Sequence, residues 1–176
     1  MSVLVTIRPV DRFDEPYFAA LQRDVFSGTE VASVELSRAI AEESTLALTG
    51  ARPALAATQR LGAFAGDALI GWTYGWFEDA GTFHMSNSGV VVGHRRTGVY
   101  SRLVQAVVEH AAGRGATVIV SRHSVLNSPV LIAKLKLGFH VTGTVFSEQF
   151  GLQVQLARHV TASRQRLFNA RVIPLR

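Results

Sequence analysis

The sequence contains no cysteine among its 176 residues. It can therefore form neither disulfides nor thiolate-bound metal sites, and its fold must be held together by packing. No apolar run reaches the ~18 residues of a membrane-spanning helix, and the N-terminus lacks the basic and apolar regions of a signal peptide. We expect a cytoplasmic protein with no membrane partner.

Acidic residues are fewer than basic ones, 13 against 18, which gives a formal net charge of +5. This balance favours an anionic partner, and both nucleic acid and a phosphorylated cofactor fit it. The basic residues are dispersed, with no Lys- and Arg-rich run interleaved with aromatics apart from a mild excess over 164–176. Nucleic acid is therefore the less favoured partner.

The length and the 48% hydrophobic content predict one α/β domain with a single core. In its first half, a helix should begin near Asp14-Glu15-Pro16 and end near Phe26, because acidic residues and proline favour a helix start. A weaker helix is expected over 31–43. Alternating apolar residues predict strands at 3–9, on both sides of the Gly66-Asp67 turn, and at 82–92. The last of these strands would place five residues on one face: His84, Ser86, Ser88, Val90 and Val92.

The second half contains the clearest periodicity of the chain. An apolar stripe at helical spacing follows Gly98 and comprises Tyr100, Leu103, Val104, Val107, Val108 and Ala111. The short apolar run 117–121 predicts a buried strand parallel to 82–92. A further helix should start with Ser128 as its N-cap and close at Gly138, and two strands should follow over 141–148 and 152–159. No structure is assigned to the basic tail, 161–176.

The segment 88–101 joins a strand to the start of the long helix through a turn that contains Arg95 and Arg96. The first N–H groups of a helix are unpaired and point along its axis, so together with two arginines they suit a phosphate group. A basic turn before a surface helix is the alternative.

Two motifs in this order resemble the GNAT superfamily of acyl-CoA-dependent N-acyltransferases over roughly residues 3–160. The family's pyrophosphate loop, Q/R-x-x-G-x-G/A, corresponds to residues 95–100, and its Asn followed by K-x-G-F corresponds to Asn127 and residues 136–139. The resemblance implies a mixed, mostly antiparallel sheet with helices on both faces, whose central parallel strands splay to admit acyl-CoA. It also implies transfer of an acetyl group from acetyl-CoA to a primary amine by direct attack, without a metal.

The resemblance assigns cofactor binding to three groups of residues: strand positions that pair with the pantetheine arm, the loop and helix start that hold the pyrophosphate, and the Asn of the second motif. These residues are Ser88, Val90, Val92, Arg95, Arg96, Thr97, Gly98, Val99, Tyr100, Ser101 and Asn127. Tyr100 departs from the small residue of the motif. Because it begins the apolar stripe, its ring is expected in the core, with stacking on CoA as the alternative.

Two further departures concern catalysis. Lys134 stands where many family members have the Tyr that protonates the departing thiolate; a solvated Lys, with water as the acid or no acid at all, is the alternative. His84 stands near the position of the base that some members use, and a histidine can accept the proton of an ammonium group. A packed histidine without chemistry is its alternative, Glu78 and Asp79 are competing bases, and His123 and Ser124 lie near the expected crevice.

Two other functions stay open. One is a fold relative that binds CoA without turnover, and the other is a nucleic-acid-binding protein that uses its basic tail. The expected acceptor is a small-molecule or peptide amine of undetermined identity. A homodimer is possible, because the final strands and tail often form dimer contacts in this family.

Overall fold

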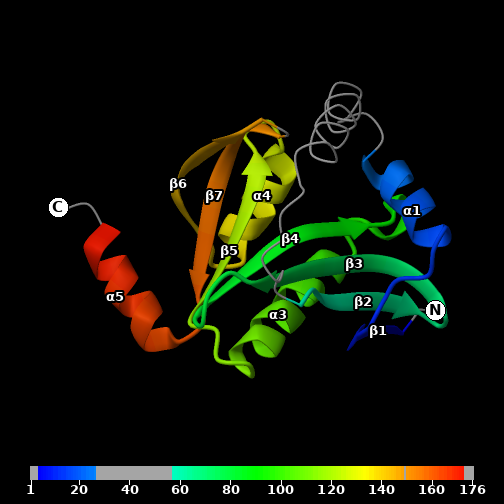
Figure 1. Ribbon diagram of the computed structural model, residues 1–176, viewed down its shortest axis with the longest axis horizontal. Coiled ribbons are helices and arrows are strands. Elements are labelled where there is room, and N and C mark those ends of the chain that lie inside the picture. The colour runs from blue at the N-terminus through cyan, green and yellow to red at the C-terminus, as the bar shows by residue number, and fades with distance from the viewer. Residues whose placement is uncertain (1–3, 27–56, 149, 173–176) are drawn as a thin grey trace, which may run out of the picture.

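The computed structural model describes residues 4–26, 57–148 and 150–172 (Figure 1). Within these residues, seven strands form one sheet in the order β1-β2-β3-β4-β5-β7-β6. Their bounds are β1 Val5–Pro9, β2 Gln59–Ala65, β3 Ala68–Phe77, β4 Thr82–Val90, β5 Val118–Ser124, β6 His140–Ser147 and β7 Gly151–His159. Every neighbouring pair is antiparallel except β4 and β5, which are parallel. The predicted mixed sheet with one central parallel pair is confirmed.

Helices cover both faces of this sheet (Figure 1). They are α1 Tyr17–Phe26, α3 Val99–Ala112, α4 Ser128–Lys136 and α5 Ala162–Val172. The apolar stripe of α3 packs on one face in a core that includes Phe83, Met85 and Val90. This face takes most of the buried apolar area, which is the main favourable contribution to folding.

The opposite face packs against α1 through a smaller aromatic cluster. Trp72 of β3 is fully buried there, with its ring edge-on to Phe18 of α1 at 5.2 Å. Its indole Nε1–H donates to Asn87 Oδ1 at 2.8 Å. A Cβ at Gly89 would lie 2.4 Å from the indole ring, so only glycine lets β4 pass this close to Trp72.

A β-bulge in β4 changes which residues share a face. Tyr74 of β3 pairs with Asn87 and Gly75 pairs with Met85, so Ser86 is the extra residue. Met85 and Val90 consequently both pack in the α3 core, whereas the ring of His84 lies beside Trp76 on the other face. The prediction that His84 and Val90 share a face is wrong, because strict alternation fails at a bulge.

Most predicted elements are confirmed, two boundaries need correction, and one helix was not predicted. The strand after Gly81 ends at Val90 rather than Val92, which lies in a 3₁₀ turn over Val92–His94. The N-cap of α4 is Asn127, not Ser128. The basic tail forms helix α5, whose Phe168 packs on His140 and His159. The helix predicted over 31–43 lies outside the described residues.

Candidate active site

The parallel strands β4 and β5 separate soon after they meet. They pair only over Thr82–His84 with Val118–Val120. Beyond these residues β4 continues to Val90 along β3, and β5 continues to Ser124 along β7, so the facing edges diverge (Figure 1). Neither edge has a strand partner there among the described residues, so backbone N–H and C=O groups are left to pair with an extended ligand.

The turn that follows β4 leads into the N-terminus of α3. Gly98 is its N-cap in the left-handed conformation, with φ 85°, and no side chain of the described residues caps the helix. The first backbone bond into the helix runs from Arg102 N–H to Gly98 O, at 3.1 Å. The N–H groups just before Arg102 therefore point out of the helix end without an intrahelical partner, which is the geometry of an anion site.

The side chains of the turn divide into those that build it and those that face outward. Arg95 Nε donates to Val90 O at 3.1 Å and its Nη2 to Val25 O at 2.9 Å, which ties the turn to β4 and α1. Thr97 Oγ1 donates to His94 O at 2.6 Å. Arg96, at φ 62°, and Ser101 are exposed. Arg95 thus braces the turn, and the cofactor contacts expected of Arg95 and Arg96 stay predictions.

Other residues assigned to cofactor binding lie around this turn. Val90 and Val99 are buried, so each offers only its backbone. Val92 is 56% exposed and lies in the 3₁₀ turn after β4, so it is not a strand residue, and its contact with the cofactor stays a prediction. Asn127 Oδ1 accepts from Val130 N–H at 3.4 Å as the cap of α4.

Tyr100 packs against the α3 core, as its place in the apolar stripe predicts. Burial raises the pKa of its phenol, and the nearby Ser88 side chain opposes that shift. No hydrogen bond of good geometry joins the two hydroxyls, because Tyr100 Oη has no partner among the described residues. The ring therefore packs in the core beneath the turn that joins β4 to α3.

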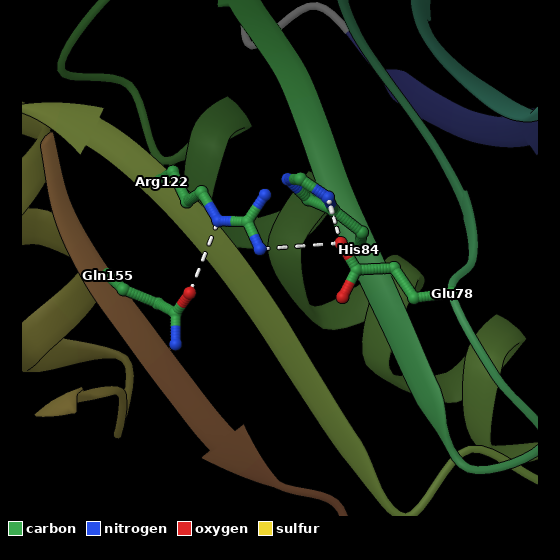
Figure 2. Close-up of polar contacts among 4 residues, drawn as sticks. All are labelled: Glu78, His84, Arg122 and Gln155. Carbon is green, nitrogen blue, oxygen red and sulfur yellow. Dashed lines mark hydrogen bonds and ion pairs between the residues drawn. The ribbon is translucent and has the colours of Figure 1, made fainter. Parts of the chain in front are cut away.

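A cluster of charged and polar residues surrounds His84 on the α1 face of the sheet (Figure 2). His84 Nδ1 lies 2.7 Å from Glu78 Oε1, in the turn between β3 and β4. Arg122 of β5 reaches the same oxygen at 3.5 Å through Nη2, and its Nε donates to Gln155 Oε1 of β7 at 3.2 Å. His84 is also the last β4 residue paired with β5, so this cluster lies at the point where the strands separate.

Lys134 of α4 lies on the opposite face at the same level of the sheet. It is fully buried, with Nζ 2.9 Å from Met85 Sδ and 4.1 Å from the centre of the Phe139 ring. Burial, with a smaller effect of Arg158, lowers the pKa of Lys134 to about 7. The alternative of a solvated lysine is wrong, because the polar face expected for this position of α4 is turned into the core.

Two polar groups of β5 lie in the same part of the sheet without a hydrogen bond. Ser121 Oγ and His123 Nε2 are buried and have no partner among the described residues. Burial first, then Lys134 and His84, lower the pKa of His123 to about 3, so its imidazole is neutral. Buried polar atoms without partners are uncommon in folded proteins, so Ser121 Oγ and His123 Nε2 are candidates for contact with a ligand.

The family comparison agrees with this geometry. A family model described as "Acetyltransferase (GNAT) family" matches residues 29–139, more than half of the chain. The chain belongs to the GNAT acetyltransferase family. It is therefore an acyl-CoA-dependent N-acetyltransferase by class. A search of curated proteins gave no match for this GNAT chain.

Solved structures show the same fold at low sequence identity. An acetyltransferase of the GNAT family from Elizabethkingia anophelis, with acetyl-CoA bound, matches with a TM-score of 0.60 and 15% identity, over 88% of this chain and 97% of that one. An aminoglycoside 6'-N-acetyltransferase complexed with coenzyme A matches with a TM-score of 0.60 and 16% identity, over 89% and 97%. Nourseothricin acetyltransferase matches with a TM-score of 0.55 and 19% identity, over 59% of this chain and 66% of that one.

Two members of the His84 cluster could not be found from the sequence. Arg122 and Gln155 are separated from Glu78 by 44 and 77 positions, and only the pairing of β5 with β4 and β7 brings them together. Neither belongs to a motif. The one available signal was the position of Arg122 just after the predicted parallel strand, where sheet-end residues often face a ligand.

Proposed function

We propose that this GNAT protein transfers an acetyl group from acetyl-CoA to a primary amine through the residues at the separation of β4 and β5. The observation that carries the proposal is the alignment of three features: the diverging parallel strands, the uncapped N-terminus of α3 beyond them, and buried titratable groups on both faces where they part.

The residues present fit the donor at both ends of this path. At α3, the backbone N–H groups of 97–101 and the exposed Arg96 would hold a pyrophosphate, because aligned N–H groups and a guanidinium stabilise phosphate oxygens. Along β4, the backbone of Ser88 and Val90 would pair with the amides of the pantetheine arm. The buried Ser121 Oγ and His123 Nε2 supply polar partners further in. Acetyl-CoA supplies the activated thioester carbonyl.

His84 and Lys134 are the proposed acid–base pair. His84 Nε2 accepts one proton from the substrate ammonium, which frees the nitrogen lone pair for attack on the acyl carbon. As the carbon–nitrogen bond forms, the carbon–sulfur bond breaks and the sulfur leaves with the electron pair. Lys134, in its ammonium form, donates a proton to that sulfur, and the second amine proton passes to water. A lysine with a pKa of about 7 is suited to this donation at neutral pH.

The acceptor would approach from the α1 face, where His84 lies. A hollow of about 360 Å³ opens on this face between α1 and the strands β2 and β3. It is lined by Arg12, Phe13, Glu15, Phe18, Gln22, Thr58, Arg60 and Tyr74. Tyr74 and Trp76 are two residues apart on β3, so their side chains lie on the same face of the sheet. The ring centre of Trp76 is 5.0 Å from that of His84, which places the hollow and the proposed base on this one face.

The test is release of free thiol from acetyl-CoA in the presence of a panel of amino acids, polyamines, aminoglycosides and peptides. With an accepted amine, His84→Gln should lower kcat/KM at neutral pH by about 10²-fold, the contribution of one general base, while the Kd for acetyl-CoA stays nearly unchanged. His110→Gln is the matched control, since His110 lies on the distant half of α3.

Binding of acetyl-CoA without amine-dependent thiol release from any of these substrates would favour the rival function, a CoA-binding protein without turnover. Wild-type kinetics of His84→Gln across the pH range would remove His84 from the reaction and leave acyl transfer itself intact.

A further inference from the structure

The side chains around His84 form a connected series drawn from four parts of the fold. Gln155 of β7 accepts from Arg122 of β5, Arg122 contacts Glu78 of the β3–β4 turn, and Glu78 contacts His84 of β4 (Figure 2). The series spans the two strands that separate. Glu78 Oε1 lies 2.7 Å from His84 Nδ1, whereas its distance to Arg122 Nη2 is longer, at 3.5 Å.

We propose that Glu78 and Arg122 are positioning residues for His84, with Glu78 fixing the imidazole so that Nε2 is the proton acceptor and Arg122 limiting the negative charge that Glu78 presents to the ring. The inference rests on the proposed function, because it assigns a task to the neighbours of the proposed base. It adds two residues to which the family motifs give no role.

The first step of the argument concerns the tautomer. An ionised carboxylate only accepts hydrogen bonds, so the 2.7 Å contact requires a proton on His84 Nδ1. In the neutral imidazole the lone pair then lies on Nε2, which points away from Glu78 (Figure 2). The Trp76 ring, 5.0 Å from the imidazole, restricts its rotation. Glu78 thus prepares His84 to accept a proton at one defined atom.

The second step concerns charge. The titratable and charged groups that act electrostatically on His84 are Glu78 from the turn, Arg122 and His123 from β5, and Lys134 from α4 across the sheet. Burial lowers the pKa of His84, Glu78 raises it through its charge and its hydrogen bond, and Arg122 and Lys134 lower it. Glu78 and Arg122 therefore act on the same imidazole in opposite directions.

The third step concerns why Arg122 is held where it is. Val120 is the last β5 residue paired with β4, and Arg122 is the next residue on that face of the strand. Its bond to Gln155 directs the guanidinium toward Glu78 across the point of separation. The Arg122 side chain is 34% exposed, so its effect on His84 is moderate and screened by solvent.

The test measures His84 directly, by NMR titration of its imidazole in the full-length protein without acetyl-CoA, with His84→Gln identifying its signal among the six histidines. In the wild type, the ¹⁵N shifts should show Nδ1 protonated. Glu78→Gln can still accept the Nδ1–H bond, so it should keep this tautomer and lower the His84 pKa. Glu78→Ala should lose the tautomer preference. Arg122→Gln should raise the pKa.

Activity supplies the second readout. The acid limb of kcat/KM against pH should move to lower pH in Glu78→Gln and to higher pH in Arg122→Gln, and Glu78→Ala should lose at least about tenfold in kcat/KM at neutral pH. Glu109→Gln and Arg114→Gln, which make the same charge changes near the far end of α3, should leave the acid limb unchanged.

An Nε2-protonated imidazole in the wild type, or pKa changes of the same sign in Glu78→Gln and Arg122→Gln, would overturn the inference. Because the titration needs no substrate, these outcomes are independent of whether any amine is acetylated. If the His84 tautomer and pKa changes are as expected but the wild type releases no thiol with any amine, the proposed function is contradicted and the inference about Glu78 and Arg122 is not.

Discussion

Lys134, the proposed acid of the reaction, also carries a cost to folding. Its ammonium lies in the core beside a thioether and an aromatic ring, and no carboxylate of the described residues pairs with it. A sulfur and a ring face stabilise a cation only in part, so burial favours the neutral amine. A leaving thiolate nearby would favour the ammonium again, which couples protonation of Lys134 to the reaction.

Replacement of this amine should therefore stabilise the fold while it impairs turnover. The pKa of Lys134 is about 7 in the folded chain against an ordinary 10.5. Between these values the unfolded chain binds more protons, so the free energy of unfolding of the wild type should rise with pH. Lys134→Met should lack this rise and be the more stable protein at pH 6.5, by on the order of a few kcal/mol.

Urea unfolding of both proteins at pH 6.5, 8 and 9.5 measures this difference, which should shrink as pH increases. Lys136→Met, an exposed lysine of the same helix, is the control and should run parallel to the wild type. A constant gap between Lys134→Met and the wild type would show that Lys134 is not a perturbed buried amine.

At the scale of elements, α4 positions Lys134, and its N-terminus is fixed by Asn127. Asn127 Oδ1 accepts from Val130 N–H, and the backbone N–H of Asn127 donates to Ser124 O at 3.0 Å, at the end of β5. The Asn that the family motif assigns to the cofactor thus has a structural task, since a cap satisfies one of the free N–H groups of a helix start.

Asn127→Ala should lower the free energy of unfolding by about 1 kcal/mol through loss of this cap, and Asn127→Asp should retain most of it. If the cap is the whole role of the side chain, the Kd for acetyl-CoA stays within about twofold in both variants. Urea unfolding and calorimetric titration with acetyl-CoA measure the two effects. A large loss of affinity without loss of stability would instead identify Asn127 as a cofactor contact.

At the scale of the whole molecule, the sheet separates the two proposed catalytic groups. Lys134 lies on the face packed by α3, whereas His84 and Glu78 lie on the face of Trp76 and α1. β4 and β5 stop pairing after His84 and Val120, and an acyl group held between the separated strands would be reached from both faces. None of the helices in the described part of the chain is long and apolar enough to span a membrane.

The elements could be predicted because each depends on local pattern. The stripe of α3 and the glycines at its ends fix that helix from its own residues. Which face of the sheet each β4 side chain occupies could not be predicted. The pairing of β4 with β3 makes Ser86 a bulge residue, and this bulge puts His84 and Val90 on opposite faces. The burial of Lys134 could not be predicted either, because it depends on contacts with Met85 of β4 and with Phe139, which follows α4.

The candidate site divides in the same way. The turn between β4 and α3 is one continuous segment, so its residues could be identified from the motif, whereas the left-handed conformation of Gly98 is seen only in the structure. The series from Gln155 to His84 is assembled by long-range strand pairing, and two of its members, Arg122 and Gln155, belong to no sequence motif. The position of Val92 outside β4 could not be predicted, because the turn that follows sets where the strand ends.

The central claim, that acetyl-CoA binds along β4 with its pyrophosphate at α3, is tested most directly by ligand-induced stabilisation of Gly98→Asp. A carboxylate at the helix start would repel the phosphates. Gly115→Asp, at the other end of α3, is the matched control: both glycines have a left-handed φ, 85° and 92°, and open space where a Cβ would be. At about 100 times its Kd, acetyl-CoA should stabilise the wild type and Gly115→Asp by about 2.7 kcal/mol and Gly98→Asp not at all. Equal stabilisation of all three proteins would contradict the account.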